Sequence, residues 1–184
     1  MPKIQNHYGK YVSFWCNKWY TDDENKSKTS LGRKPSMKIA ISSDHGGNNL
    51  RKEIMALLDE LAISYEDFGP QSSDSVDYPD YARPVAERVA SGEFDKGILI
   101  CGTGIGISIA ANKFKGIRCA LVHDTFSAKA TRNHNDSNIL AMGERVIGAG
   151  LAREIVTTWL HAEFEGGRHV RRVEKISEIE EQQQ

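Results

Sequence analysis

The stretch Gly97-Ile98-Leu99-Ile100-Cys101-Gly102-Thr103-Gly104-Ile105-Gly106-Ile107-Ser108 decides the fold. An apolar run of strand length ends at Cys101 and enters three glycines at alternate positions, after which helical spacing begins. Glycines let backbone N–H groups converge, and a helix start adds positive potential, so such a turn can stabilise an anion or a developing oxyanion. A dinucleotide-binding fingerprint would need glycine at position 107, where Ile107 stands, so that interpretation fails. A tight turn without any ligand stays open as an alternative.

The same change from a short apolar run to helical spacing recurs along the chain. Strands are expected over residues 38–42, 64–68, 96–101, 117–122 and 139–142, and helices over 48–61, 81–91, 107–112, 123–133, 148–162 and 168–181. Five strands that alternate with helices predict a parallel sheet with helices on both faces. Ligands of such sheets bind beyond the carboxyl ends of the strands. Candidate site residues are therefore expected over 43–47 and 101–106, and in the loops after Val122 and Met142.

Composition excludes several classes of protein. The chain has 184 residues, 39% of them hydrophobic and 27% charged, which suits one globular domain. A net charge of −1 argues against a general binder of nucleic acid or acidic membranes, and the sequence predicts no membrane span. The three cysteines, Cys16, Cys101 and Cys119, lack a CxxC spacing, which argues against a disulfide framework or a Cys-rich zinc site. We expect a cytoplasmic protein.

The first 36 residues differ from the rest. They are rich in aromatic residues and carry seven Lys/Arg against three Asp/Glu. The apolar segment of a secretory signal is missing, and Arg33 is the only arginine, which disfavours an organellar transit peptide. We expect residues 1–36 to be a poorly ordered N-terminal extension and residues 37–184 to be a single domain with a C-terminal helix.

Four side chains near predicted strand or helix ends suggest chemistry. Local dipoles could activate the Cys101 thiol, although a buried cysteine is more often a small hydrophobe. Asp44 and His45 could bind a sugar hydroxyl or a phosphate, or Asp44 could simply cap a helix. His134, in a polar run expected to be a loop over 132–136, could act as a general acid or base, or lie on the surface without a role.

A basic cluster near the C-terminus suggests an anionic ligand. Arg168 and Arg172 are four residues apart and share one face of a helix, where two guanidinium groups could clamp a phosphate. Arg145 could be a third donor. A solvated basic face is the alternative, but arginines near the predicted crevice of an otherwise acidic domain favour a small anion.

Five motifs in order resemble the type B ribose-5-phosphate isomerases, a family that includes the related allose- and galactose-6-phosphate isomerases. They are SDHGG over 43–47, DYPDYA over 77–82, GILICGTGIGISIAANK over 97–113, RNHNDSN over 132–138 and EGGRHVRR over 165–172. The resemblance covers residues 37–181. It implies a Rossmann-like α/β/α sandwich and a homodimer with active sites at the subunit interface, and leaves open whether two dimers associate. It also implies a reaction without metal or cofactor.

The resemblance further implies an aldose–ketose isomerisation of ribose 5-phosphate and ribulose 5-phosphate, a step of the pentose phosphate pathway, through an enediolate. In one branch of the family the base is a cysteine that closes the third strand, and Cys101 holds that position here. The other branch lacks this cysteine and has a glutamate where Ile107 stands, so the chain matches the cysteine branch. His134 would open the sugar ring. Substrate contacts carry over to Asp44, His45, Gly102, Thr103, Gly104, Ile105, Gly106, Asn135, Arg145, Arg168 and Arg172, and Tyr78 matches a tyrosine near the site. An isomerase of allose or galactose 6-phosphate, or a non-catalytic sugar-phosphate-binding module, remains an alternative.

Overall fold

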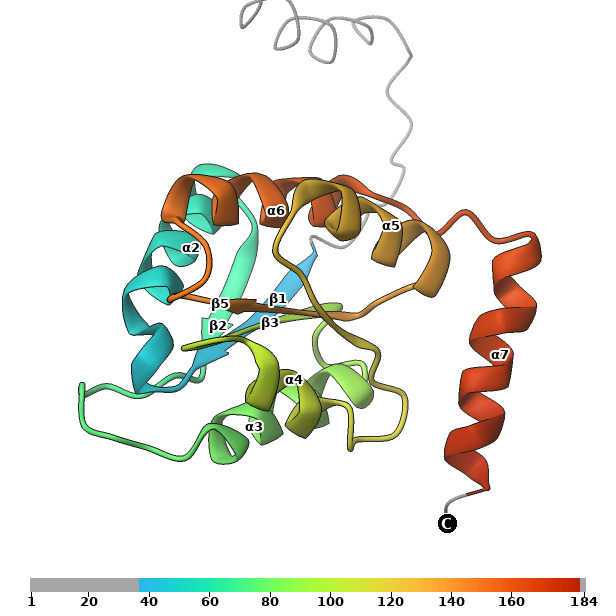
Figure 1. The fold of residues 1–184 in the computed structure, drawn as a ribbon, viewed down its shortest axis with the longest axis horizontal. Coiled ribbons are helices and arrows are strands. Elements are labelled where there is room, and N and C mark those ends of the chain that lie inside the picture. The colour runs from blue at the N-terminus through green and yellow to red at the C-terminus, as the bar shows by residue number, and fades with distance from the viewer. Residues whose placement is uncertain (1–36, 183–184) are drawn as a thin grey trace, which may run out of the picture. The chain divides into compact units, whose positions relative to one another are not determined.

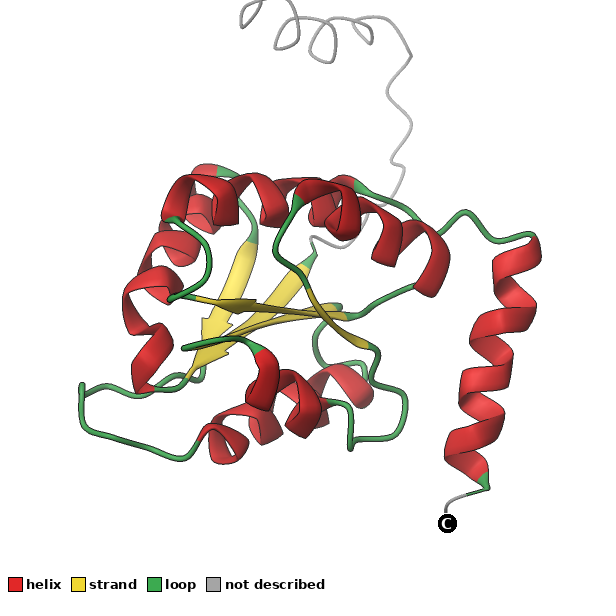
Figure 2. Cartoon of the chain, viewed as in Figure 1, coloured by secondary structure: helices red, strands yellow, loops and turns green. Residues whose placement is uncertain are grey.

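A parallel sheet between helices forms the domain. The computed structural model describes residues 37–182, and the extension expected over residues 1–36 lies outside them. The strands β1 (Lys38–Ser43), β2 (Ser64–Asp67), β3 (Lys96–Cys101), β4 (Cys119–Leu121) and β5 (Ile139–Gly143) pair in parallel in the order β2-β1-β3-β5-β4. Figures 1 and 2 show this sheet edge-on between two helical layers. The predicted five-stranded parallel α/β fold is therefore confirmed.

The helices divide between the two faces of the sheet. Helices α2 (Asn48–Glu60), α5 (Thr125–Asn135) and α6 (Ala149–His161) cover one face, while α3 (Tyr78–Ala90) and α4 (Ile105–Ala111) cover the other (Figure 1). A single 3-10 turn, η2 (His45–Gly47), links β1 to α2. The last helix, α7 (Arg168–Glu181), lies outside both layers and begins beside the end of α5 (Figure 1), and Glu180 near its own end accepts from the N–H of Gly116 at 3.1 Å.

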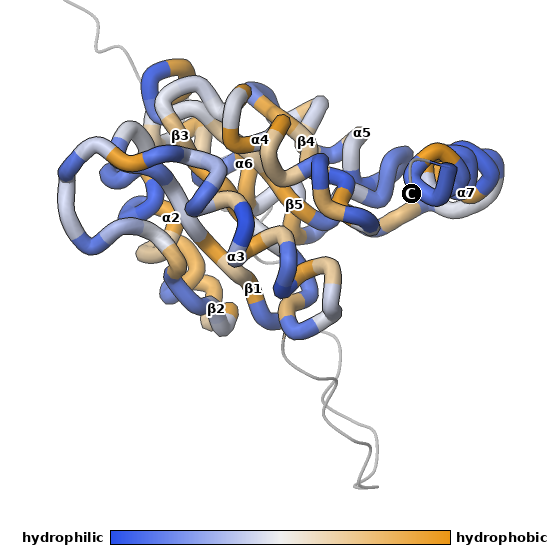
Figure 3. Tube along the Cα trace, turned by 90° about the horizontal axis from the view of Figure 1, so that it is seen from below, coloured by the Kyte–Doolittle hydropathy of each residue, from blue (hydrophilic) through white to orange (hydrophobic). Residues whose placement is uncertain are grey.

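Each face of the sheet has its own apolar core. Residues of β3 alternate between the cores: Ile98 and Ile100 pack on the face of α2 and α6 around Trp159, whereas Leu99 and Cys101 pack on the face of α3 and α4. All six residues of β3 are buried, as expected for a central parallel strand. Figure 3 shows hydrophobic colour along the strands and mainly hydrophilic colour along α7.

Several predicted boundaries were wrong by up to three residues. Helix α3 begins at Tyr78 rather than at residue 81, because Pro79 lies in its first turn, where a backbone N–H is not needed. Strand β4 spans only Cys119–Leu121 instead of 117–122. The polar run expected to be a loop over 132–136 includes the last turn of α5, because Asp136 takes the left-handed backbone of a helix end and pairs with Arg132 at 2.7 Å.

Gly104 is the tightest point of the loop after β3. Its φ is +78°, and a Cβ built there would lie 2.5 Å from Leu121 Cδ1 and 2.8 Å from the backbone carbon of Met142. Gly92 has a similar φ of +77°, but a Cβ there would meet nothing within 4 Å. Alanine substitutions at these two positions therefore separate the cost of left-handed backbone, which both share, from the cost of the Cβ collision, which occurs only at position 104.

We expect Gly104→Ala to lower the free energy of unfolding by about 2–4 kcal/mol, because left-handed backbone costs roughly 1 kcal/mol and overpacking roughly 1–3 kcal/mol. Gly92→Ala should cost only about 1 kcal/mol. Urea unfolding of both variants measures the difference. Equal losses in the two variants would contradict the collision at position 104.

Candidate active site

The thiol of Cys101 lies at the carboxyl end of β3, surrounded by backbone. The side chain is 4% exposed, and the N–H of Gly104 donates a hydrogen bond to Sγ at 3.0 Å. An N–H donor at that position stabilises negative charge on the sulfur. The side chains of Thr103 and Ile105 are exposed on the same loop, and Thr103 Oγ1 accepts from the N–H of Ile105 at 3.2 Å.

The turn after β1 packs directly against the Cys101 loop. Asp44 Oδ1 accepts from the N–H of Gly46 at 2.8 Å, and the N–H of Asp44 donates to the carbonyl of Ile100. A Cβ at Gly46 would lie 3.3 Å from the nitrogen of Gly102, so the two loops touch. His45 Nδ1 accepts from the N–H of Val76 at 3.2 Å, which leaves Nε2 as the protonated nitrogen of a neutral ring.

Arg145 and Glu144 follow β5 and complete this edge. The N–H groups of Glu144 and Arg145 donate to the carbonyls of Cys101 and Gly102, each at 3.0 Å. A Cβ built at Gly102 would lie 3.5 Å from the guanidinium carbon of Arg145, so the guanidinium group lies against the glycine loop. The Glu144 carboxylate accepts from the backbone N–H groups of Asn49 and Leu50 at 2.9 Å, and so caps α2. Sequence analysis assigned no role to Glu144.

Tyr78 covers the first turn of α4. A Cβ at Gly106 would lie 2.8 Å from Cζ of the Tyr78 ring, so glycine at that position lets the tyrosine lie flat beside the glycine loop. The structure thus brings one set of predicted site residues together at the carboxyl edge of the sheet: Asp44, His45, Tyr78, Cys101, Gly102, Thr103, Gly104, Ile105, Gly106 and Arg145.

The other predicted site residues lie at the opposite edge. His134 and Asn135 end α5, which runs back from β4 towards the start of β5, and the carbonyl of Asn138 accepts from the N–H of Gly97 at the beginning of β3. Four residue steps along β3 separate Gly97 from Cys101, or roughly 13 Å at 3.3 Å per residue. Arg168 and Arg172 begin α7 beside the end of α5. A single chain therefore does not bring these four residues to Cys101.

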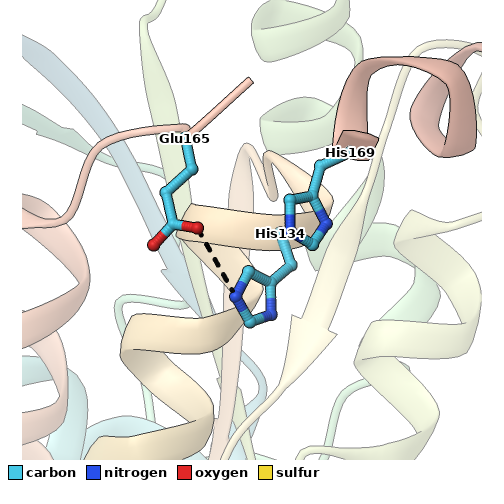
Figure 4. Close-up of side chains that lie close together, drawn as sticks. All are labelled: His134, Glu165 and His169. Carbon is cyan, nitrogen blue, oxygen red and sulfur yellow. Dashed lines mark ion pairs between the residues drawn. The ribbon is translucent and has the colours of Figure 1, made fainter. Parts of the chain in front are cut away.

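A cluster of His134, Glu165 and His169 lies at this second edge (Figure 4). The two imidazole rings stack with centroids 4.4 Å apart and planes 7° from parallel. His134 Nε2 lies 3.8 Å from Glu165 Oε2. Glu165 and His169 belong to the motif over 165–172, but their residue types predicted no role for them. Both follow His134 by 30 or more residues, so no local periodicity links them to it.

These three side chains are also a donor set for a metal ion, with ligand atoms within 4.8 Å of one another. A metal lies in the plane of each imidazole that binds it. Parallel stacked rings do not aim at a common point, so binding would require one ring to turn. The nearby guanidinium groups of Arg168 and Arg172, whose charge also lowers the pKa of His169, further oppose a cation.

The comparisons with known proteins agree with this fold and these motifs. The model of the ribose/galactose isomerase family matches residues 39–176. A putative sugar phosphate isomerase of Bacillus subtilis, YwlF, is 71% identical over 146 residues, covering 79% of this chain and 98% of the relative. Ribose-5-phosphate isomerase B of Escherichia coli is 55% identical, covering 78% and 97%. The structure of ribose-5-phosphate isomerase B from Clostridium thermocellum superposes with a TM-score of 0.79 at 57% identity, covering 80% and 100%.

The chain belongs to the ribose/galactose isomerase family and is a sugar phosphate isomerase. Another relative, 42% identical and covering 80% of this chain and 97% of its own length, is a D-erythrulose-4-phosphate isomerase of Pectobacterium atrosepticum. Within residues 37–182, no helix is both long and apolar enough to cross a membrane.

The pKa of His169 makes the second edge sensitive to pH. Burial lowers the pKa of His169 below its ordinary value of 6.5, and three neighbouring bases lower it further, against a weaker opposite effect of Glu165. These bases are His134, Arg168 and Arg172. As the pH falls, the unfolded chain therefore binds a proton at this position before the folded chain does, and stability is lost.

We expect His169→Phe to lose less stability than the unmodified protein when the pH falls from 7.5 to 5, because phenylalanine keeps the stacked ring but takes up no proton. Urea unfolding at both pH values measures this. His161→Phe, at an exposed position, is the control and should keep the original pH dependence. Equal pH dependence in His169→Phe and the unmodified protein would show that His169 titrates normally.

Proposed function

We propose that the protein interconverts ribose 5-phosphate and ribulose 5-phosphate. The observation that carries the proposal is the Cys101 thiol at the end of a central strand, with a backbone N–H directed at its sulfur at 3.0 Å. The names of the Escherichia coli and Clostridium thermocellum proteins support this substrate pair. The two cysteines within the described residues are not in disulfides, which suits the expected cytoplasmic location.

The chemistry divides between Cys101 and His134. His134 moves a proton between the ring oxygen and the C1 hydroxyl of the cyclic sugar, which gives the open aldehyde. Cys101, as thiolate, takes the proton from C2, and the electron pair of that bond forms the enediolate. The proton of the C2 hydroxyl passes to the C1 oxygen, and the same sulfur returns its proton to C1, so that the C2 oxygen becomes the ketone of ribulose 5-phosphate.

Backbone amides and charged side chains support these steps. Within the loop 102–106 the N–H groups of Gly104 and Ile105 already bind Cys101 Sγ and Thr103 Oγ1, so the other N–H groups of the loop stabilise the enediolate oxygen. Each such donor is typically worth roughly 3 kcal/mol of the barrier. Asp44 and His45 bind sugar hydroxyls, with Thr103, Ile105, Asn135 and Tyr78 beside them. The arginines Arg145, Arg168 and Arg172 hold the phosphate, so that its binding energy positions C1 and C2.

The complete site requires two chains. Cys101 and His134 of one chain lie at opposite ends of the strands, and β3 alone spans roughly 13 Å from Gly97 to Cys101. A two-fold homodimer in which the carboxyl edge of one subunit meets the amino edge of the other would form two sites, each with Cys101 from one subunit and His134 from the other. Helix α7 supports this arrangement, because three of its apolar side chains, Val170, Ile176 and Ile179, remain 40–56% exposed in the single chain.

A four-carbon substrate is the second candidate. The Pectobacterium atrosepticum relative is named for D-erythrulose 4-phosphate, which has the same reacting carbons and the same terminal phosphate at a shorter distance. The chain's own reaction can therefore be tested with aldose phosphates of different length.

We expect the purified protein, without added metal, to isomerise ribose 5-phosphate with a higher kcat/KM than allose 6-phosphate, galactose 6-phosphate or erythrose 4-phosphate. Cys101→Ala should reduce kcat about 10³-fold, the scale of a lost general base. Cys119→Ala is the matched control: burial raises the pKa of the Cys119 thiol to about 12, so this cysteine stays protonated, and the variant should keep its activity. Turnover of none of the four sugars would leave a binding module, and an active Cys101→Ala would remove Cys101 as the base.

We expect Cys101→Ala and His134→Ala, each nearly inactive alone, to recover activity when unfolded together at equal amounts and refolded. Random pairing makes about half of the dimers mixed, each with one intact site and one doubly altered site, so about a quarter of the original activity should return. Refolding either variant alone is the control. No recovery in proven mixed dimers would place both residues in a site formed by one chain.

A further inference from the structure

We infer that Glu165 and His169 are positioning residues that hold the imidazole of His134 for opening the sugar ring. This inference rests on the proposed function. Glu165 approaches the Nε2 edge of the ring and His169 covers one of its faces (Figure 4). Together these two contacts restrict the rotation of a ring whose side chain is otherwise 43% exposed.

The chain holds Glu165 at the end of α5 by contacts other than the histidine. The backbone N–H of Glu165 donates to the carbonyl of Asn133 at 3.0 Å, and Asn133 Nδ2 donates to Glu165 Oε1 at 2.8 Å. The second carboxylate oxygen, Oε2, is the one that faces His134. Glu165 is therefore fixed on both its backbone and its side chain before it meets the imidazole.

Two glycines then turn the chain back onto His134. Gly166 and Gly167 have φ values of +64° and +55°, a region that favours glycine. The turn places His169 in the first turn of α7, where it is 6% exposed and its ring lies over that of His134. Arg168 Nε donates to His169 Nε2 at 3.4 Å and so helps to fix the covering ring.

The carboxylate also selects a tautomer. Glu165 Oε2 lies 3.8 Å from His134 Nε2, which is longer than a hydrogen bond, so the carboxylate acts through its charge. That charge favours the form of His134 with the proton on the nearer nitrogen, Nε2, and the lone pair on Nδ1. Because the Glu165 side chain is 53% exposed, the pair contributes little to stability, and its effect should appear in the rate.

The test compares a substrate that must be opened with one that is always open. Ribose 5-phosphate is cyclic, whereas D-erythrose 4-phosphate cannot close a ring because its C4 oxygen carries the phosphate. The variants are Glu165→Gln, which keeps the amide contact to Asn133 and loses the charge, and His169→Phe, which keeps the stack and loses the ring nitrogens. Glu163→Gln and His161→Phe, both at exposed positions outside the cluster, are the matched controls.

We expect Glu165→Gln to lower kcat for ribose 5-phosphate about tenfold, part of the roughly 10²–10⁴-fold that a general acid–base group supplies, with KM little changed. The rate with erythrose 4-phosphate should stay within about twofold, because the Cys101 step does not use His134. His169→Phe should show the same selectivity with a smaller effect, and the controls should show none. Equal slowing of both substrates by Glu165→Gln, or no slowing of either, would overturn the inference.

Nitrogen-15 NMR of histidine-labelled protein gives a second readout that does not depend on turnover of erythrose 4-phosphate. The His134 ring of the unmodified protein should be in the Nε2–H tautomer, and Glu165→Gln should move it towards a mixture of tautomers. An unchanged tautomer in Glu165→Gln would refute the role of the carboxylate. If the unmodified protein isomerises no sugar phosphate, the proposed function fails; an active protein whose variants behave like the controls refutes only this inference.

Discussion

The site depends on how closely the backbone approaches the end of β3. The N–H of Gly104 reaches the sulfur of Cys101 at 3.0 Å only because the loop turns through a left-handed residue against β5. A Cβ at Gly143 would lie 2.5 Å from the backbone carbon of Thr103, so the strand that supports the loop must also lack a side chain there. Glycines on both sides of the contact thus let main-chain dipoles, rather than side chains, surround the thiol.

The parallel sheet imposes the second constraint. Helix α5 must return from the carboxyl edge to the amino edge before β5 can begin, so the residues at its end, His134 among them, lie far from Cys101 in the same chain. Under the proposed function, a second chain is therefore needed by topology and not only for stability. The same geometry explains why α7 begins where His134 lies and carries the arginines to that edge.

Local sequence patterns predicted the five strands and the six α-helices of the described residues, because apolar periodicity is a property of neighbouring residues. They also identified Cys101, at the junction of a buried strand and a glycine loop. They failed where a distant contact decides the outcome. The helix predicted over 123–133 ended too early, because the residues after it are polar, yet the ion pair between Arg132 and Asp136 closes a helical turn that reaches Asn135. The stacking of His134 on His169 joins residues 35 positions apart and leaves no periodic trace.

The Glu144 carboxylate occupies the start of α2, and this limits where a substrate phosphate can bind. The start of a helix is the usual place for a phosphate in α/β proteins, because its N–H groups are unpaired. At α2 those groups, on Asn49 and Leu50, already bind the Glu144 carboxylate, so a phosphate would have to displace an anion of the protein itself. The start of α4 lies beside Cys101, where the proposed reaction needs its amides for the enediolate. A substrate phosphate is then left to side-chain cations, and Arg168 and Arg172, four residues apart on α7, supply guanidinium groups, which can bind phosphate through two hydrogen bonds each.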